Sequence, residues 1–218
     1  MRVRRHSIGM LIDHDGLVVR APRWVGIAEI EDALRDKSTW ILRKLGEWRQ
    51  HGHRMPRHDW QHGAPFLFRG NTIELAVFPA RKRSVAADLF HLRITIPSPN
   101  EPQQVASLVT RWLREETERH IAPRVFQYAA RVSPIIPRVR LSSARTQWGS
   151  CNRHAEIRLN YRLIQLPPLL SEYVVAHEVA HLRELNHSRA FWETVESLFP
   201  DYRHARKELE RFVPLLDT

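Results

Sequence analysis

The sequence predicts an α+β protein made of two parts. The first hundred residues carry short alternating apolar patterns, typical of strands, around one helical pattern, whereas helical periodicity dominates the rest. A run rich in turn-forming residues separates the two patterns, Pro97-Ser98-Pro99-Asn100-Glu101-Pro102. We therefore predict a β-rich N-terminal region with one helix over residues 1–100 and a second domain over residues 101–218.

The N-terminal region is predicted to begin with a β-hairpin. Two apolar stretches, residues 5–12 and 17–21, flank the turn-forming segment Asp13-His14-Asp15-Gly16. A helix is predicted over residues 27–50 because apolar residues recur there at roughly helical intervals. Three strands are predicted next, over residues 66–68, 72–78 and 90–96, with a turn at Arg69-Gly70-Asn71.

The second domain is predicted to begin with a helix over residues 103–132, which Pro123 should kink or split because proline lacks an amide hydrogen. Residues 139–146 and 156–163 are predicted to pair as a hairpin, because apolar and polar residues alternate strictly in the second of them. Three more helices are predicted, over residues 169–185, 188–198 and 202–212.

One helical segment carries the chemistry, His177-Glu178-Val179-Ala180-His181, followed by His187. Residues four apart lie on one face of a helix, about 5–6 Å apart at Cβ, so His177 and His181 can bind the same zinc ion. Glu178 lies about 100° around the helix from His177, where it can reach a zinc-bound water and act as a general base. This pattern predicts a hydrolytic zinc site.

The surroundings of the motif favour a metal site over ordinary histidines. Apolar residues surround most of the helix axis over residues 169–185, and two imidazoles and a carboxylate would be costly to bury there without a partner. Asn186 suits the end of this helix and Ser188 the start of the next, so His187 stands at a turn that can fold it back as the third ligand. Otherwise Glu193 or Glu196 would take its place.

The composition bounds the class of protein. The chain has 34 Lys and Arg against 24 Asp and Glu, and the excess lies in residues 1–140. This basic N-terminal part is compatible with a nucleotide or nucleic acid partner, although scattered arginines are also common on a solvated surface. The single cysteine, Cys151, excludes an intramolecular disulfide, and no apolar stretch is long enough for a secretion signal or a membrane span. We expect a cytoplasmic protein that does not bind membranes.

Several segments of the C-terminal third carry a family resemblance in addition to the His177 to His181 motif: Trp148-Gly149-Ser150-Cys151, Ile157-Arg158-Leu159-Asn160, Leu166-Pro167, Tyr173-Val174-Val175, Asn186-His187-Ser188, Phe191-Trp192 and Pro200-Asp201-Tyr202. Together they resemble the YgjP-like metallopeptidase family, a zincin group related to the SprT-like and WLM proteases. The resemblance is strong over about residues 140–212 and looser before them. It implies a zincin-like metallopeptidase domain in which His177, His181 and His187 hold one Zn²⁺ ion and Glu178 is the catalytic base.

Some residues depart from related patterns. Glu184 stands where metzincins have glycine, and no methionine follows the helix, so a metzincin is rejected. Thr146-Gln147 and Tyr161 differ from the residues that the YgjP-like pattern often has at these positions.

The expected function is zinc-dependent hydrolysis of a peptide bond, with Glu178 activating a zinc-bound water. The same site offers an alternative, a nucleoside triphosphate pyrophosphatase with the Arg-rich N-terminal part holding the phosphates, or a nucleic-acid-associated protease. A purely structural zinc module is disfavoured because it needs no general base. An edge strand beside the metal would hold an extended peptide by main-chain hydrogen bonds.

Other roles stay open at this stage. The donor that stabilises an oxyanion could be any of five residues, Tyr161, Tyr173, Tyr202, His154 or Arg158. Cys151 is expected to be a small buried residue in a tight turn rather than a ligand. Trp148 could pack in the core or wall the cleft, and Asp201 suits a helix N-cap better than a hydrogen-bond partner of a ligand histidine.

Overall fold

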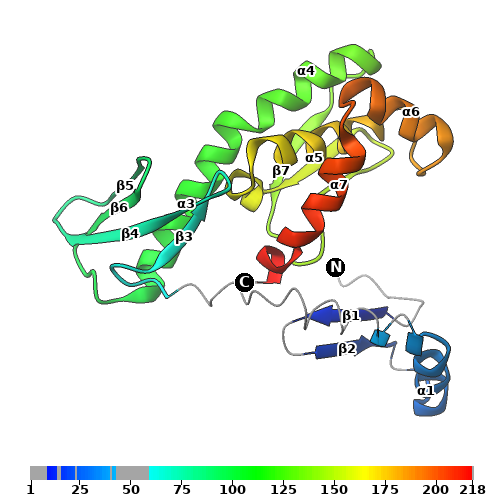
Figure 1. Ribbon diagram of the computed structural model, residues 1–218, viewed down its shortest axis with the longest axis horizontal. Coiled ribbons are helices and arrows are strands. Elements are labelled where there is room, and N and C mark those ends of the chain that lie inside the picture. Colours follow the sequence, from blue (N-terminus) through cyan, green and yellow to red (C-terminus); the bar gives the residue numbers. More distant parts are fainter. Residues whose placement is uncertain (1–8, 14–15, 23, 40, 43–58, 218) are drawn as a thin grey trace. The chain divides into compact units, whose positions relative to one another are not determined.

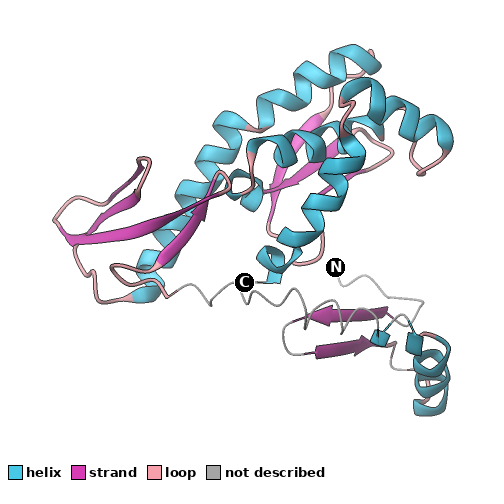
Figure 2. Ribbon diagram, in the orientation of Figure 1, coloured by secondary structure: helices cyan, strands magenta, loops and turns pink. Residues whose placement is uncertain are grey.

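The computed structural model describes residues 9–13, 16–22, 24–39, 41–42 and 59–217. It divides the chain into two compact units, Met1–Met55 and Pro56–Leu216. The ribbon in Figure 1 follows the chain through both units, and Figure 2 distinguishes helices from strands. The mixture of separate sheets and helices confirms the α+β class. The boundary that we predicted at residue 100 stays a prediction.

The described residues of the first unit include a hairpin and helix α1. Strands β1 (Gly9–Asp13) and β2 (Gly16–Arg20) pair antiparallel with Asp13 opposite Gly16, as the turn-forming segment predicts. Residues 5–8 of the predicted first strand lie outside the described residues. Helix α1 (Ile27–Asp36) begins where predicted and is interrupted by a turn at Lys37, whose amide donates a hydrogen bond to the Ala33 carbonyl (3.2 Å); residues 38, 39, 41 and 42 are helical again, as predicted. Residues 43–50 of the predicted helix also lie outside the described residues.

The second unit opens with a four-stranded sheet in the order β3-β4-β6-β5. Its strands are β3 (Pro65–Phe68), β4 (Asn71–Pro79), β5 (Ser84–Ala87) and β6 (His91–Ile96). Strands β4 and β6 run parallel, and the other neighbours are antiparallel. The three strands predicted from the sequence are confirmed, whereas the short edge strand β5 was not predicted.

The predicted turn between β3 and β4 joins this sheet to the rest of the unit. Arg69 and Gly70 both have positive φ, 51° and 81°. Their amides donate to the carbonyls of Ile164 (3.2 Å) and Gln165 (2.8 Å). A Cβ at Gly70 would lie 2.8 Å from Cγ of Pro167, so glycine is required both for the backbone conformation and for this close approach.

Two helices follow the sheet, α3 (Pro102–His120) and α4 (Ala122–Val132). The helix is interrupted at Ile121, two residues before Pro123, which confirms the predicted split. Along α3 the buried side chains recur at helical intervals, among them Val105, Leu108 and Val109.

A three-stranded sheet in the order β7-β9-β8 lies beside the helices. The predicted hairpin of residues 139–146 and 156–163 is wrong, because β7 (Arg138–Ser142) and β9 (Glu156–Asn160) run parallel. The hairpin partner of β9 is β8 (Gly149–Cys151). Its turn is built by Asn152, whose side-chain oxygen accepts from the amides of His154 (2.9 Å) and Glu156 (3.1 Å). After Asn160 the chain forms a 3₁₀ helix, η1 (Tyr161–Gln165), instead of continuing the predicted strand.

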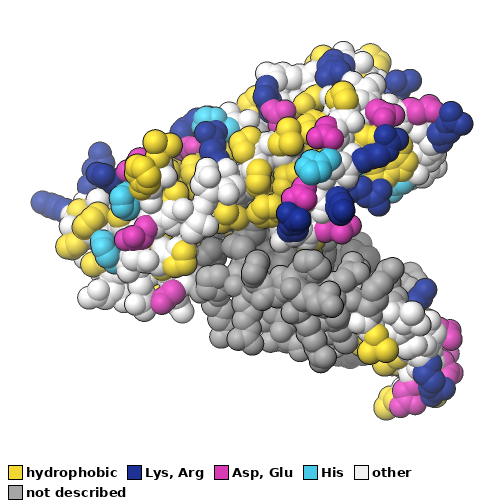
Figure 3. Space-filling model, in the orientation of Figure 1, with side chains coloured by type: hydrophobic (Ala, Val, Ile, Leu, Met, Phe, Trp, Pro, Cys, Tyr) yellow, Lys and Arg dark blue, Asp and Glu magenta, His cyan; other side chains and the backbone are white. Residues whose placement is uncertain are grey.

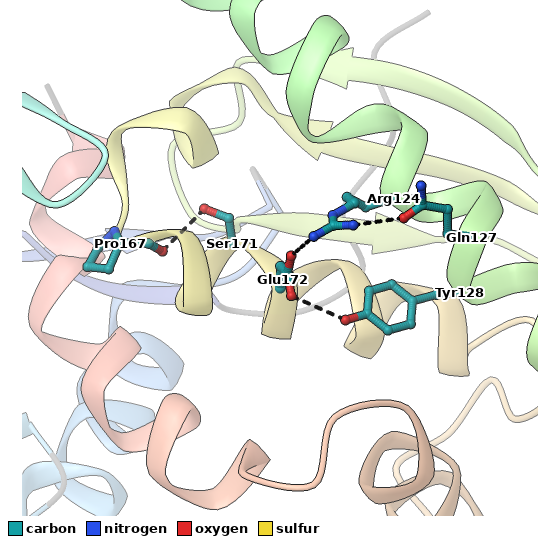
Figure 4. A network of polar contacts seen from close by, with 6 residues as sticks. All are labelled: Arg124, Gln127, Tyr128, Pro167, Ser171 and Glu172. Atoms are coloured by element: carbon teal, nitrogen blue, oxygen red, sulfur yellow. Dashed lines mark hydrogen bonds and ion pairs between the residues drawn. The ribbon is translucent and has the colours of Figure 1, made fainter. Parts of the chain in front are cut away.

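The central helix of the unit is α5 (Pro168–Ala180), which begins at a proline and ends in a turn over residues 181–183. It contacts α4, α6, α7 and the three-stranded sheet, and most of its residues are buried, as its apolar circumference predicts (Figure 1). Glu172 anchors it to α4 through an ion pair with Arg124 and a 3.4 Å hydrogen bond from Tyr128 (Figure 4). The hydroxyl of Ser171 donates to the Leu163 carbonyl (2.7 Å).

The chain ends with α6 (Arg189–Leu198), α7 (Tyr202–Leu209) and a 3₁₀ helix, η2 (Glu210–Asp217). Ser188 caps α6 by accepting a hydrogen bond from the Phe191 amide (3.2 Å), as predicted. Asp201 occupies the N-cap position of α7 but makes no side-chain capping bond. No helix in the described part of the chain is long and apolar enough to cross a bilayer. The cytoplasmic location stays a prediction.

Candidate metal centre

Three histidines meet at the end of α5. His177 and His181 lie one turn apart on the same face of the helix, and the chain folds back after residue 183 to bring His187 to them. One ring nitrogen of each histidine lies within 4.8 Å of the other two. Nε2 of His187 is 3.2 Å from Nε2 of His177. The structure therefore brings together the three residues that the motif singled out.

The arrangement of these nitrogens fits a zinc ion. Zinc holds imidazole nitrogens at about 2.0–2.1 Å, so two ligands of a tetrahedral site lie about 3.3 Å apart, close to the observed 3.2 Å. Nδ1 of His181 is 2.9 Å from the Glu184 carbonyl, and a proton on Nδ1 leaves Nε2 as a free acceptor for a metal. The local backbone thus sets the tautomer that metal binding needs.

Burial favours the neutral form of His177 and His181. It lowers the pKa of His177 to about 3, with further lowering by His181, His187 and Arg206. Burial also lowers the pKa of His181, against a raising effect of its hydrogen bond to Glu184. Neutral imidazoles can bind a cation without first losing a proton.

Aromatic side chains from α6 wall the three histidines. Phe191 packs against all three rings, closest to His181 at 4.5 Å between centroids. Trp192 stacks on His187 at 5.8 Å with an interplanar angle of 26°. His187 is itself exposed to solvent, so its ring orientation depends on contacts such as this stacking on Trp192.

Glu178 lies about 100° around the helix from His177, and its side chain contacts strand β8 of the three-stranded sheet. Its side chain is only 6% exposed, and burial raises its pKa to about 8. A Cβ at Gly149 would lie 2.6 Å from Cγ and 2.7 Å from Oε1 of Glu178. Strand β8 therefore lies directly on the carboxyl group, and the missing side chain of Gly149 makes room for it.

The alternative third ligands lie elsewhere. Glu193 pairs with Arg189 (2.8 Å) and Glu196 pairs with Arg203 (3.0 Å), both on exposed surface. Among the described residues, the three histidines are the set of His, Cys, Asp or Glu side chains whose atoms converge as a metal site requires. The geometry favours His187 over both glutamates.

The five candidate oxyanion donors are scattered. Tyr173 packs edge-on against His177 (6.0 Å between centroids), and Tyr202 stacks on Trp192 (5.4 Å). Arg158 lies opposite Ser150 on the sheet face that points away from Glu178, because alternate strand residues face opposite sides. His154 is exposed in the β8–β9 turn, and Tyr161 is buried between Arg114 and Arg162. Tyr173 and Tyr202 are thus the tyrosines that pack around the histidines.

The structure adds two residues that sequence reasoning missed as parts of the site. Gly149 belongs to a segment that carried the family resemblance, but its contact with Glu178 depends on how β8 crosses α5. Arg206 stands on α7 with its guanidinium 4.9 Å from the centre of the Trp192 ring. Neither position has a local sequence signal for this role, because both contacts form between elements that are distant along the chain.

Two histidines and a buried carboxyl group at the end of the central helix, with a third histidine folded back to them, are the arrangement expected of a metal-dependent hydrolase. The chain belongs to the YgjP-like metallopeptidase family: the family model described as the YgjP-like metallopeptidase domain matches residues 6–212. This confirms the resemblance. No curated protein and no solved structure gives a significant match.

The basic residues provide no support for a nucleotide partner. On the face shown in Figure 3, Lys and Arg side chains are interspersed with Asp and Glu. Much of the N-terminal part that motivated this partner lies outside the described residues. A nucleic acid partner stays a prediction, while the family supports a peptide or protein substrate.

Proposed function

We propose that the protein is a zinc-dependent peptidase in which His177, His181 and His187 hold one zinc ion and Glu178 is the general base. The observation that carries this proposal is the convergence of three ring nitrogens within 4.8 Å of one another, next to the helix that carries His177 and the buried carboxyl group of Glu178. A purely structural zinc site would gain nothing from burying Glu178, which is costly.

The proposed chemistry divides between the metal and the chain. Zinc, when bound, supplies a Lewis acid that polarises the scissile carbonyl and lowers the pKa of water. Glu178 takes the proton of the attacking water and passes it to the leaving amine. In the metal-free protein burial raises the pKa of Glu178 to about 8, and the charge of a bound zinc ion would lower it from that value towards the range in which a carboxylate can take up and release a proton near neutral pH.

An open strand edge supports a peptide as the substrate. The Trp148 carbonyl accepts from the Asn160 amide (2.8 Å), and the Asn152 amide donates to the Glu156 carbonyl (3.1 Å). Because hydrogen-bonded pairs alternate in an antiparallel ladder, the amide and carbonyl groups of Gly149 and Cys151 point to the other side of β8. In the described sheet β8 is an edge strand. An extended peptide paired there would pass Glu178, which lies against Gly149.

The test compares the zinc-loaded protein with Glu178→Gln and Glu193→Gln. Each is incubated with a mixed peptide library and, separately, with nucleoside triphosphates, and products are identified by mass spectrometry while zinc content is measured on the same samples. Glu178→Gln should keep its zinc and lose about 10²–10⁴-fold in peptide cleavage. Glu193→Gln, the matched control on an exposed glutamate, should change neither.

A further variant tests the ligand set. His187→Ala should lose zinc, because only two of the three proposed histidine ligands would remain. Full zinc retention by His187→Ala together with zinc loss in Glu193→Gln would transfer the third ligand to the glutamate. Cleavage of nucleoside triphosphates with intact peptides would replace the peptidase by a phosphoanhydride hydrolase, and equal cleavage by Glu178→Gln would remove Glu178 as the base.

A further inference from the structure

Arg206 holds a positive charge at the rim of the histidine cluster. It is exposed on α7, and its guanidinium lies 4.9 Å from the centre of the Trp192 ring. The same tryptophan stacks on His187, so the cation and the third histidine contact one aromatic ring. A cation held against the face of a tryptophan has a restricted set of orientations.

The charge of Arg206 is uncompensated within the described residues, where it makes no ion pair and no hydrogen bond. Arg203, three residues earlier on the same helix, provides the contrast. Its guanidinium stacks on Tyr202 at 4.8 Å and is neutralised by Glu196 at 3.0 Å. Two arginines with similar aromatic contacts therefore differ in whether a carboxylate is already bound.

Arg206 is close to the histidines through this one ring. Trp192 packs against His177 at 5.9 Å and against His187 at 5.8 Å between ring centroids, and it also carries the guanidinium of Arg206. The cation therefore shares an aromatic neighbour with two of the three histidines.

We propose that Arg206 is a specificity-determining residue that binds a carboxylate of the substrate close to the scissile bond. This inference rests on the proposed peptidase function. A planar guanidinium can bind a carboxylate through two parallel hydrogen bonds, and Trp192 orients it before the ligand arrives. The carboxylate can belong to the C-terminus of a peptide or to an Asp or Glu side chain.

The two sources are separated by matched peptides. An acetylated hexapeptide, Ala-Ala-Phe-Leu-Ala-Ala, is prepared with a C-terminal acid and with a C-terminal amide. A second pair, both amidated, carries Asp or Asn at the fifth position. Dissociation constants are measured by calorimetry on zinc-loaded Glu178→Gln protein, so that binding does not depend on turnover, and cleavage is measured separately on the protein with Glu178 intact.

In the Glu178→Gln background, the acid or the Asp peptide should bind about tenfold more tightly than its neutral partner, and less so as salt is raised. Adding Arg206→Gln should abolish the difference without changing zinc content or the affinity for the neutral peptides. Arg206→Lys should keep part of it, because it retains the charge but not the planar fork. Arg203→Gln should leave the difference unchanged.

Equal or undetectable binding of the charged and neutral peptides would overturn the role of Arg206, as would a preference that survives Arg206→Gln or disappears in Arg203→Gln. Cleavage without any carboxylate preference would leave the peptidase standing and remove this inference. An Arg206-dependent preference without cleavage would do the reverse. A preference confined to the first peptide pair would assign the C-terminal carboxylate, and one confined to the second would assign an acidic side chain.

Discussion

The four-stranded sheet and helix α5 differ in whether they bury polar side chains. In β4 the buried side chains are all apolar, and polar Asn71, Thr72 and Glu74 are exposed. Helix α5 buries Glu178 among apolar neighbours and raises its pKa to about 8. Burying a carboxyl group costs free energy that packing alone does not require. The difference separates a part of the chain that serves folding from one that bears a cost for chemistry.

Mutation at the contact between β8 and α5 should have the largest effect on peptide cleavage. Gly149→Ala should reduce peptide cleavage by about 10²–10³-fold with zinc retained, because the new methyl group would displace the carboxyl group of Glu178 from its position. Steady-state kinetics and zinc content measure this effect. Ser150→Ala, on the opposite face of the same strand, is the control and should change little.

Loss of folding in Gly149→Ala is distinguished from loss of positioning by a double-mutant cycle. If the clash with Glu178 is the cause, the stability cost of Gly149→Ala should largely disappear when Glu178 is already Ala. The same cost in both backgrounds would mean that the strand itself needs glycine.

The sheet offers the converse test. Leu75 in β4 is fully buried among apolar residues, so Leu75→Ala should lower the free energy of unfolding by about 3 kcal/mol. Urea unfolding measures the loss, and cleavage per folded molecule should stay unchanged well below the unfolding midpoint. A large fall in kcat with the protein still folded would mean that the sheet contributes to the reaction.

The burial of Glu178 in α5 should also make the free energy of unfolding depend on pH. In the metal-free protein Glu178 has a pKa raised from 4.5 to about 8, so the unfolded chain releases this proton first and Glu178 lowers stability increasingly as pH rises from about 4.5 to 8. Glu178→Gln should therefore be more stabilising at pH 8 than at pH 5, by about 3–4 kcal/mol.

His177 acts in the other direction in the same protein. Its lowered pKa means that stability is lost as pH falls from 6.5 towards about 3. Both proteins retain His177, so its contribution cancels when wild type and Glu178→Gln are compared at each pH. A difference between them that does not change with pH would show that Glu178 is not the titrating group.

Local rules predicted much of the fold. The hairpin around residues 14–15, the break before Pro123 and the cap at Ser188 all depend on residues close together in sequence, and all three are confirmed. The convergence of His177 and His181 likewise follows from helical spacing. These features need no knowledge of what packs against them.

The errors share a different cause. Strand β8 has three residues and no alternating pattern, so its existence depends on pairing with β9. The parallel pairing of β7 with β9 joins segments that have another strand between them in sequence. Arg206 approaches the site because α7 packs beside Trp192, which no local pattern encodes. What escaped prediction was therefore the part of the site contributed by β8 and α7.

Cys151 should show the smallest effect, although its strand covers the carboxyl group of Glu178. Burial, with a contribution from Glu178, raises the pKa of its thiol to about 11, so at pH 8 only about one thiol in a thousand is ionised. Alkylation by iodoacetamide, which requires the thiolate, should be about a hundredfold slower than for a free cysteine, as mass spectrometry can follow. Cys151→Ala should change peptide cleavage less than about threefold, because the hydrogen bond that the protonated thiol donates to the Asn152 carbonyl, at 3.6 Å, is weak. Zinc loss or a large fall in activity in that variant would instead make the thiol part of the metal centre, and β8 would then contribute a side chain as well as the space left by Gly149.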